Sequence, residues 1–420
     1  MIKFREVLAD RNFLFLWLGQ LISNFGDRLT QMALVALVYQ RNPGSEIALA
    51  KLISFTIIPV FVIGPIAGVW VDRLNRKNVM VMSDILRGCL VLSIPFFIGI
   101  NHILPVYLAV FLAFSISRFF IPSKMAIIPD IVSRDKLLIA NTLSDTTHML
   151  GNVIGLVVAG MIVNIKSIGA IGGFYIDGIT FFVSALLIAM IAHVRSIKEV
   201  KESLVKTTEA LGNSIRKSIF SDIVDGMKTI SAHADMRFIV GVFFLLMAGL
   251  GAISCVIIVF IQNAFGNSTK DLGLLGMFLA GGLFAGTIFY GRFGQKINKR
   301  KVIFLSFIAS GISVILFTVS VSRFPSLFLA GAIAAILGMS ASPIMISANT
   351  LTHESIPQAL RGRVFSSLEA VIHLAFLVFM FAAAYAAKYV DRSWVLLLTG
   401  GVFCVSGVLG SVYGTTKEAT

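Results

Sequence analysis

The stretch GVWVDRLNRKNV, residues 68–79, recurs in the second part of the chain as GRFGQKINKRKV, residues 291–302. In both copies a glycine is followed by a basic residue, an asparagine and two further basic residues. Each copy lies between long apolar segments. Internal repeats of this kind are typical of membrane transporters, so the sequence predicts two halves related by duplication.

The composition is that of a membrane protein. Of 420 residues, 57% are hydrophobic and 13% are charged, with a mean hydropathy of +0.91, whereas soluble domains carry about 25% charged residues. A net charge of +14 would favour nucleic acid as the partner of a soluble domain. Here the basic residues lie in short stretches between apolar runs, so we attribute the charge to membrane topology.

Twelve apolar segments are each long enough to cross a hydrocarbon core roughly 30 Å thick. Backbone groups have no water partner in lipid, so we expect each crossing to be an α-helix. The predicted segments are residues 12–39, 48–71, 78–100, 104–126, 138–163, 168–193, 236–263, 271–294, 301–321, 325–348, 364–387 and 393–414.

The basic residues also predict the orientation. With twelve crossings, 24 Lys and Arg residues lie on the side of the two termini and seven lie on the opposite side. This asymmetry predicts that both termini are in the cytoplasm and that the protein lies in the inner (cytoplasmic) membrane. The first apolar run is longer than the apolar core of a signal peptide and lacks a small-residue cleavage site, so we expect a retained helix.

The longest polar segment marks the boundary between the halves. We predict an N-terminal six-helix bundle over 1–194, a cytoplasmic linker over 195–235 and a C-terminal six-helix bundle over 236–420. Apolar residues at Ile219, Ile223, Met227 and Ile230 are spaced like one face of a helix, so the linker is expected to contain an amphipathic helix. A regulatory domain is the alternative interpretation of this segment.

The sequence contains no motif typical of a disulfide-rich protein, a metal-binding protein, an ATPase or an enzyme. The three cysteines, Cys89, Cys255 and Cys404, fall in apolar segments without metal-ligand spacing, so neither a disulfide framework nor a metal site is expected. The chain has no phosphate-binding GKS or GKT loop, so ATP is not the expected energy source, and no cofactor is predicted. No cluster of nucleophile, base and orienting group indicates an enzyme.

The cassette GPIAGVWVDRLNRK, residues 64–77, resembles the loop motif between the second and third helices of the major facilitator superfamily. Further stretches are similar to the branch that contains macrolide-efflux and enterobactin-export permeases: LWLGQLISNFGDRL (16–29), SDILRG (83–88), FIPSKMAIIPDIV (120–132), IDGITFFVSAL (176–186) and RGRVFSS (361–367). The resemblance implies an all-α fold of twelve transmembrane helices in two pseudo-symmetric six-helix halves. It also implies transport by alternating access.

The cassette has a physical rationale of its own. Gly64 and Gly68 lie one helical turn apart, which is expected to let this helix approach a neighbour closely. Asp72 is placed at a helix end, where a carboxylate can accept hydrogen bonds from the N-terminus of another helix. The resemblance implies that Asp72 docks against residues 361–365 and holds the cytoplasmic gate closed.

The basic residues of the cassette leave two interpretations open. Arg73, Arg76 and Lys77 either take part in the gate or serve as topology anchors alone. The second copy has Gln295 in place of the aspartate, so we expect it to keep the topological role without the latch.

Ionisable residues inside membrane helices are costly and usually functional. Asp27 lies nearest a helix centre, at about 2 Å along the axis, and is the expected site of proton coupling. We expect Arg118 to lie within reach of Asp27, whereas Arg28 points about 100° away around the helix. The alternative for Asp27 is a permanently paired residue that holds helices together.

The remaining buried charges have structural as well as functional interpretations. Asp84 and Arg87 are three residues apart and are predicted to form a structural pair in the network of the cassette. Asp177 is assigned equally to helix packing and to the cavity. Asp145 with His148, and Glu369 with His373, could relay protons, but hydrogen bonds between helices are the simpler expectation.

Glycines on one predicted helix bear on the direction of transport, and the many Phe and Met residues bear on the kind of substrate. Gly151, Gly155 and Gly160 resemble the antiporter motif of exporters in the superfamily and predict tight packing of their helix. The chain contains 35 Phe and 15 Met, which favours an adaptable apolar cavity.

Three functional hypotheses follow. The first is a proton-coupled exporter of hydrophobic or amphipathic molecules of the drug, macrolide or siderophore type. The second is a lipid or lysophospholipid transporter, and the third is a transport-inactive scaffold or membrane enzyme. The expected partners of the preferred hypothesis are the lipid bilayer, a small amphipathic substrate and the proton, with the chain acting as a monomer.

Overall fold

The computed structural model describes residues 4–71, 74–100, 103–192, 234–266, 269–294, 297–355 and 361–416. The predicted amphipathic helix at 219–230 lies outside these residues. The helices are α1 (Phe4–Leu8), α2 (Arg11–Arg41), α3 (Glu46–Val62), α4 (Gly64–Val71), α5 (Arg76–Gly99), α6 (Leu104–Ile131), η1 (Arg134–Lys136), α7 (Leu137–Asn164), α8 (Gly169–Ala189), α10 (Ala234–Phe265), α11 (Lys270–Phe293), α12 (Lys299–Arg323), α13 (Leu327–Ser355), α14 (Arg361–Ala386) and α15 (Arg392–Thr416).

The predicted apolar segments coincide with these helices. In the described part of the chain, ten helices are long and apolar enough to span a membrane. The segment 12–39 corresponds to α2, which has 31 residues and carries Asp27 and Arg28 in its interior. The segment 48–71 corresponds to the pair α3 and α4. The all-α polytopic fold expected from the sequence is therefore present.

The break between α3 and α4 falls at Ile63. A proline at position 65 has no backbone N–H to donate to the preceding turn, so it interrupts the helical ladder at this point. The chain continues at once as helix, because the Ala67 N–H donates to the Ile63 carbonyl at 2.8 Å. One apolar segment thus becomes two consecutive helices.

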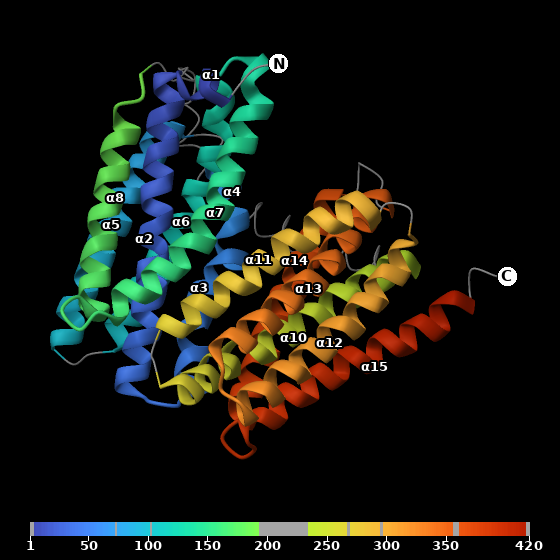
Figure 1. Ribbon diagram of the computed structural model, residues 1–420. Coiled ribbons are helices and arrows are strands. Elements are labelled where there is room, and N and C mark those ends of the chain that lie inside the picture. Colours follow the sequence, from blue (N-terminus) through green and yellow to red (C-terminus); the bar gives the residue numbers. More distant parts are fainter. Residues whose placement is uncertain are drawn as a thin grey trace, which may run out of the picture. The chain divides into compact units, whose positions relative to one another are not determined.

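The chain divides into two compact units. The first contains residues 1–40 and 51–218, and the second contains residues 41–50 and 219–420. Figure 1 shows α2, α5, α6, α7 and α8 as one bundle of long helices and α10 to α15 as another. Fully buried side chains such as Phe13 and Ile127 form the core of the first unit. In the second unit the rings of Phe307 and Phe403 pack with their centroids 5.4 Å apart.

Small residues set the distance between α2 and α8. Gly19, Gly26 and Ala33 recur at a heptad spacing, which brings them to one side of α2. A Cβ atom added to Gly19 would lie 3.2 Å from Ser184 Oγ, and one added to Gly173 would lie 3.2 Å from Ala33 Cβ. The absence of larger side chains lets α8 press its polar residues against the backbone of α2.

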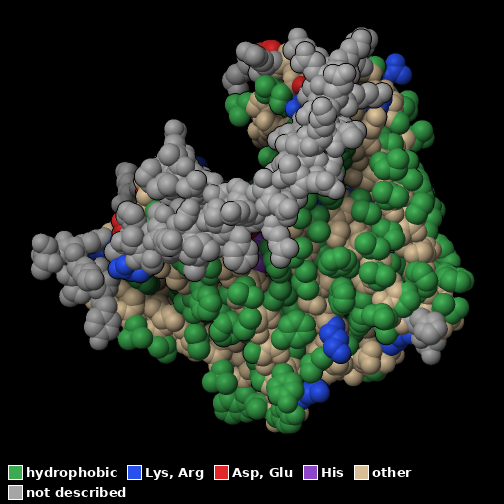
Figure 2. Space-filling model, turned by 180° about the vertical axis from the view of Figure 1, so that it is seen from behind, with side chains coloured by type: hydrophobic (Ala, Val, Ile, Leu, Met, Phe, Trp, Pro, Cys, Tyr) green, Lys and Arg blue, Asp and Glu red, His purple; other side chains and the backbone are tan. Residues whose placement is uncertain are grey.

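The outer surface of the bundles is apolar. Figure 2 shows hydrophobic side chains over much of the described surface on one face, interrupted by a few Lys and Arg side chains. Phe96, Leu186 and Phe328 are 65%, 64% and 82% exposed. Apolar exposure of this extent is unusual for soluble proteins and suits contact with lipid.

Candidate functional site

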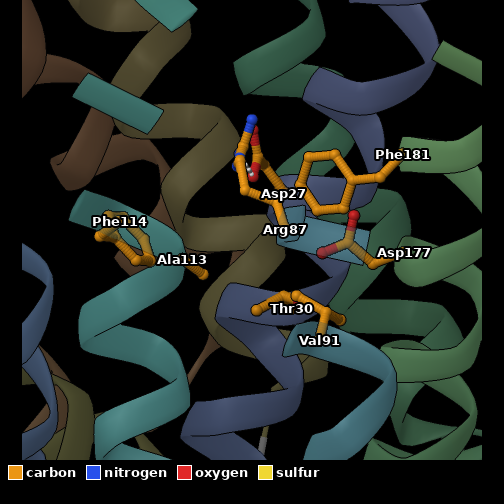
Figure 3. Close-up of a pocket in the computed structure, with 8 residues that line it drawn as sticks. All are labelled: Asp27, Thr30, Arg87, Val91, Ala113, Phe114, Asp177 and Phe181. Atoms are coloured by element: carbon orange, nitrogen blue, oxygen red, sulfur yellow. Dashed lines mark hydrogen bonds and ion pairs between the residues drawn. The ribbon is translucent and has the colours of Figure 1, made fainter. Parts of the chain in front are cut away.

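The buried side chain of Arg87 holds together three helices of the first unit. Arg87 Nη2 on α5 donates to Asp27 Oδ1 on α2 at 2.6 Å, and Arg87 Nη1 lies 3.6 Å from Asp84 Oδ1. Its Cζ atom lies 4.1 Å from the ring centroid of Phe181 on α8. Figure 3 shows the Arg87 and Asp27 side chains meeting beside the Phe181 ring. We call Asp27, Asp84, Arg87, Asp177 and Phe181 the Arg87 cluster.

Asp84 is the most enclosed partner of Arg87. Its side chain is fully buried, and Ser184 Oγ donates to Asp84 Oδ2 at 2.6 Å. This bond joins α5 to α8. Because Asp84 and Arg87 are one turn apart on α5, the carboxylate also limits where the guanidinium can go. Asp84 therefore positions Arg87 for its contact with Asp27.

Asp177 lies in the seam between α8 and α2. It is fully buried, and Thr180 Oγ1 donates to Asp177 Oδ1 at 3.1 Å. A Cβ atom on Gly26 would come within 2.2 Å of Asp177 Oδ1 and 2.0 Å of Thr180 Oγ1. Glycine at position 26 is thus what allows the carboxyl group to fit between the two helices.

The Arg87 cluster borders a cavity of about 20 Å³, which is large enough for about one water molecule. Side chains from α2, α5, α6 and α8 line it: Asp27, Thr30, Arg87, Val91, Ala113, Phe114, Asp177 and Phe181. The cavity touches both the partly exposed Asp27, at 31% of its side chain, and the buried Asp177. The cluster therefore combines three carboxyl groups, one guanidinium and room for water.

The pairing of Asp27 differs from the sequence expectation. Its ion-pair partner is Arg87, whereas Arg118 lies within electrostatic range of Asp27 and has its Nε and Nη2 atoms 3.3 and 3.1 Å from Ser117 Oγ. The sequence assigns Asp84 and Arg87 to the network of the cassette, but Arg87 contacts Asp84, Asp27 and Phe181 in the interior. In the sequence, the motif Asp84-x-x-Arg87 within an apolar helix is the signal for buried charges. The contact of Arg87 with Asp27 has no such signal, because it depends on how α2 and α5 are rotated.

The other candidate residues are not members of this cluster, although the Asp27 charge acts on His148. Asp145 and His148 are exposed on α7. On α14 the His373 Nδ1 atom lies 3.2 Å from Glu369 Oε2, one turn away on the same helix rather than on a neighbouring one. Within the described chain, no group of three His, Cys, Asp or Glu side chains could hold a metal ion.

The described part of the cassette caps a helix and anchors it. Asn75 accepts a hydrogen bond from the Asn78 N–H at 3.2 Å as the N-cap of α5. Arg76 Nη1 contacts Asp130 Oδ2 at 2.6 Å, and Lys77 Nζ donates to the Ile191 carbonyl at 2.7 Å. These bonds join the start of α5 to the ends of α6 and α8.

Other parts of the gate prediction are not tested or do not hold. Asp72, Arg73 and Gln295 lie outside the described residues, and so do the surroundings of Gly68 and the side chains of residues 361–366. Gly64 has no atom within 4 Å of the position of an added Cβ, so it is not the site of close helix packing that the sequence suggested. It begins α4 directly after the break at Ile63.

The second copy of the cassette repeats the same arrangement. Asn298 accepts from the Arg300 N–H at 2.9 Å as the N-cap of α12. Lys299 Nζ lies 2.5 Å from Glu354 Oε1 on α13, and Arg300 pairs with Asp235. Sequence reasoning missed the acidic partners Asp130 and Glu354 because each stands on a different helix, far along the chain from its base.

The three glycines of α7 have different surroundings. An added Cβ on Gly155 would lie 2.9 Å from Arg28 Cγ, whereas one on Gly151 would have no atom within 4 Å. Gly160 is buried. Tight packing therefore holds at Gly155 and not at Gly151, where the space beside the helix is open.

Two units of long apolar helices, the first with paired charges in its interior, define a polytopic membrane transporter. The chain belongs to the Major Facilitator Superfamily, whose family model matches residues 16–253 and 238–420.

Several similar proteins are named for export or drug resistance. The chain is 24% identical over 396 residues to the putative bacilysin exporter BacE of Bacillus amyloliquefaciens, covering 93% of each protein. It is 22% identical over 404 residues to macrolide efflux protein A of Streptococcus pyogenes, covering 94% of each. Over 273 residues it is 28% identical to multidrug resistance protein 2 of Bacillus subtilis (strain 168), covering 64% of this chain and 63% of the relative.

Solved structures share the fold at low sequence identity. A bacterial homologue of the iron transporter ferroportin in an inward-facing state superposes with a TM-score of 0.70 at 14% identity, covering 96% of this chain and 98% of that one. A POT family transporter in complex with 5-aminolevulinic acid gives 0.71 at 13% identity, covering 97% and 96%. The family and the similar proteins are membrane transporters, not enzymes.

Proposed function

We propose that this transporter exports hydrophobic or amphipathic small molecules in exchange for protons, with the Asp27–Arg87 pair as the coupling element. The observation that carries the proposal is the sharing of Arg87 between a partly exposed carboxylate, Asp27, and a fully buried one, Asp84. The efflux names of the relatives support export as the direction.

The charge count of the Arg87 cluster suggests how a proton acts. Three carboxyl groups surround one guanidinium, and burying an excess of negative charge is unfavourable. A proton taken up by Asp27 neutralises its carboxylate and weakens the bond to Arg87. The guanidinium then keeps Asp84 as its ionic partner on the same helix. Loss of the proton restores the bond between α2 and α5.

Exposure favours Asp27 as the residue that exchanges its proton. Its side chain is 31% exposed, whereas Asp84 and Asp177 are fully buried. Substrate and proton would bind in turn as alternating access changes which side of the membrane reaches Asp27. A hydrophobic or amphipathic cargo suits the apolar interior and agrees with relatives named for macrolides, bacilysin and multiple drugs.

The proposal includes orientation and organisation. Both termini lie in the cytoplasm of a cell whose inner membrane holds the protein, and the chain works as a monomer of two bundles, 1–194 and 236–420, joined by the linker 195–235. In this orientation the Arg76–Asp130 and Lys299–Glu354 pairs lie at the cytoplasmic surface. A latch between Asp72 and residues 361–365 is part of the proposal. It is tested by cysteine accessibility from the cytoplasmic side, which should rise in Asp72→Asn.

Proton coupling is tested in vesicles that contain the purified protein and a pH-sensitive dye. Amphipathic compounds are screened for substrate-dependent proton movement, and the active compound is then used with Asp27→Asn. The variant should lose uphill transport driven by a pH gradient while retaining exchange of labelled for unlabelled substrate. Asp145→Asn is the matched control, because it removes an exposed carboxylate from the same unit.

Two outcomes would contradict this function. Uphill transport by Asp27→Asn at the wild-type rate removes Asp27 from coupling. Movement of labelled lysophospholipid that is independent of a pH gradient, together with no transport of the screened compounds, favours the alternative of a lipid transporter.

A further inference from the structure

A second cavity in the first unit lies between α2 and α7, outside the Arg87 cluster. Its volume is about 530 Å³, within the range of roughly 300–1,000 Å³ for sites that bind drug-sized molecules. We call it the α2–α7 pocket. Its lining residues are Trp17, Leu21, Ile22 and Phe25 of α2 and Thr147, Gly151, Ile154 and Gly155 of α7.

Glycines on α7 explain why the pocket is empty of side chains. Arg28 Cγ occupies the place beside Gly155, so α2 and α7 are in contact there. One turn earlier, the space beside Gly151 holds no atom within 4 Å of an added Cβ. The helices are therefore held together beside Gly155 and by the hydrogen bond between Trp17 and Thr147, and they leave a gap between these two contacts.

The wall of the pocket contains one fixed polar pair. Trp17 Nε1 donates to Thr147 Oγ1 at 2.9 Å. Because the threonine oxygen accepts this bond, its own proton is left to donate to a further acceptor. The bond also fixes the indole ring of Trp17, whose flat apolar surface can stack against a ring of a ligand.

We propose that the α2–α7 pocket binds the ring-bearing apolar part of the exported molecule, with Thr147 donating to one of its ether or carbonyl oxygens. This rests on the proposed function and names the substrate class as an amphipathic ring compound that carries an oxygen acceptor. A hydrocarbon chain of a lipid would fill the apolar space but would use neither the indole face nor the hydroxyl donor. The observed polar pair therefore favours the ring compound over the lipid.

The pocket shares α2 with the coupling element. Phe25 faces the pocket, while Gly26 and Asp27 contact α8 and α5 on other sides of the same helical turn. A ligand that occupies the gap acts on the helix that carries the Asp27 carboxylate. Occupancy of the pocket and the state of the Asp27–Arg87 bond are thereby linked through α2.

The test uses the purified full chain and the ester-bearing dye rhodamine 6G, with binding followed by fluorescence polarisation. Gly151→Phe places a ring in the open space without a predicted clash and should weaken dye binding by at least about tenfold. Gly401→Phe on α15 is the matched control, since Gly401 also has no atom within 4 Å of an added Cβ. Its affinity should stay within about twofold of the wild type.

Two further variants distinguish a filled pocket from a loss of folding as the cause of weaker dye binding. Gly151→Ala adds one carbon and should leave dye binding almost unchanged. Thr147→Val keeps the shape but removes both the donor to the ligand and the acceptor that fixes Trp17, so binding should weaken by at least about fivefold. All variants are compared by gel filtration and by Tm, and the Tm of Gly151→Phe should match that of the wild type.

The outcomes distinguish the pocket from the proposed function. Wild-type affinity in Gly151→Phe, or no saturable dye binding by the wild type, overturns the pocket as a substrate site. Displacement of the dye by lysophosphatidylcholine at lower concentrations than by a non-fluorescent aromatic ester overturns the ring compound as occupant. If dye binding depends on Gly151 but its transport moves no protons, the pocket stands and the proposed proton coupling fails.

Discussion

Arg87 Nη2 lies 2.6 Å from Asp27 Oδ1 and thereby joins α5 to α2 in the interior of the first unit. The same guanidinium packs on Phe181 and lies near Asp84, so its position is fixed from three sides. If the bond to Asp27 is lost, the Arg87 guanidinium still has Asp84 beside it. Its charge therefore does not have to move through apolar surroundings to find another partner.

Replacing Arg87 by lysine should impair coupling although the charge is kept. A lysine has no planar fork, so it cannot contact Asp27 and Asp84 while packing on Phe181. We expect Arg87→Lys to reduce proton-driven uptake into inverted vesicles by at least about tenfold. Arg118→Lys is the control, because Arg118 makes its described hydrogen bonds with the neighbouring Ser117. Equal activity of the two variants would contradict a specific role for the Arg87 fork.

Substituting Gly26 should separate α2 from α8. The added Cβ of Gly26→Ala would lie 2.0 Å from Thr180 Oγ1, and relieving such overpacking typically costs about 1–3 kcal/mol. We expect a lower Tm and weaker transport. Gly64→Ala should have little effect on either, since no atom lies within 4 Å of its Cβ position. A Tm for Gly26→Ala equal to that of Gly64→Ala would rule out the close seam.

The second unit contains its own ion pair, between a buried glutamate and a partly exposed arginine. Arg392 Nε pairs with Glu46, which is 4% exposed, and Arg392 Nη2 donates to the Gly44 carbonyl at 2.9 Å. Arg392→Met leaves the Glu46 carboxylate buried without its base, which should cost about 3–5 kcal/mol. The double variant Glu46→Gln, Arg392→Met should recover part of this loss in a thermal unfolding assay. A double variant less stable than Arg392→Met would contradict the pairing.

The start of α15 should become sensitive to acid. The Ser393 hydroxyl and N–H groups hold the pKa of Asp391 below its usual range by hydrogen bonding to its carboxylate, and the N–H bond measures 2.8 Å. A lowered folded-state pKa stabilises the fold above the unfolded value of about 3.9, and this stabilisation is lost as the pH falls through the folded value.

The variant Asp391→Ala removes this cap. Its Tm should fall by about 2–4 °C at pH 7. The difference from the wild type should shrink as the pH is lowered below about 4, where the wild-type carboxylate also becomes protonated. A difference that stays constant down to about pH 2 would show that the carboxylate charge is not involved.

The sequence predicted the spans well because bilayer thickness and backbone hydrogen bonding leave few choices for a long apolar segment. It also drew attention to Asp27, since an acid in the middle of such a segment is unusual. The partner of Asp27 could not be predicted in the same way. Which bases face it depends on the rotation of α5 and α6, and glycines such as Gly26 set that packing through contacts far apart in the sequence.

Glycine patterns were informative about the kind of contact but not about its place. Gly155 meets Arg28, yet Gly151 and Gly64 face open space despite similar spacing. The spacing of small residues shows where a helix can be approached closely by another helix. Which residue of a neighbouring helix lies there depends on the packing of the whole bundle. The basic residues at the starts of α5 and α12 were likewise evident from the cassette, but their acidic partners on other helices were not.

The bridges Arg76–Asp130 and Lys299–Glu354 bear on the history of the chain. Arg76 and Lys299 occupy the same place in the two copies of the cassette, and the acid follows its base at almost the same interval, 54 positions in one copy and 55 in the other. This correspondence indicates one ancestral contact. In one copy a long guanidinium meets a short carboxylate, and in the other a lysine meets the longer glutamate. The property inherited through the duplication is thus the combined reach of two side chains, not the identity of either.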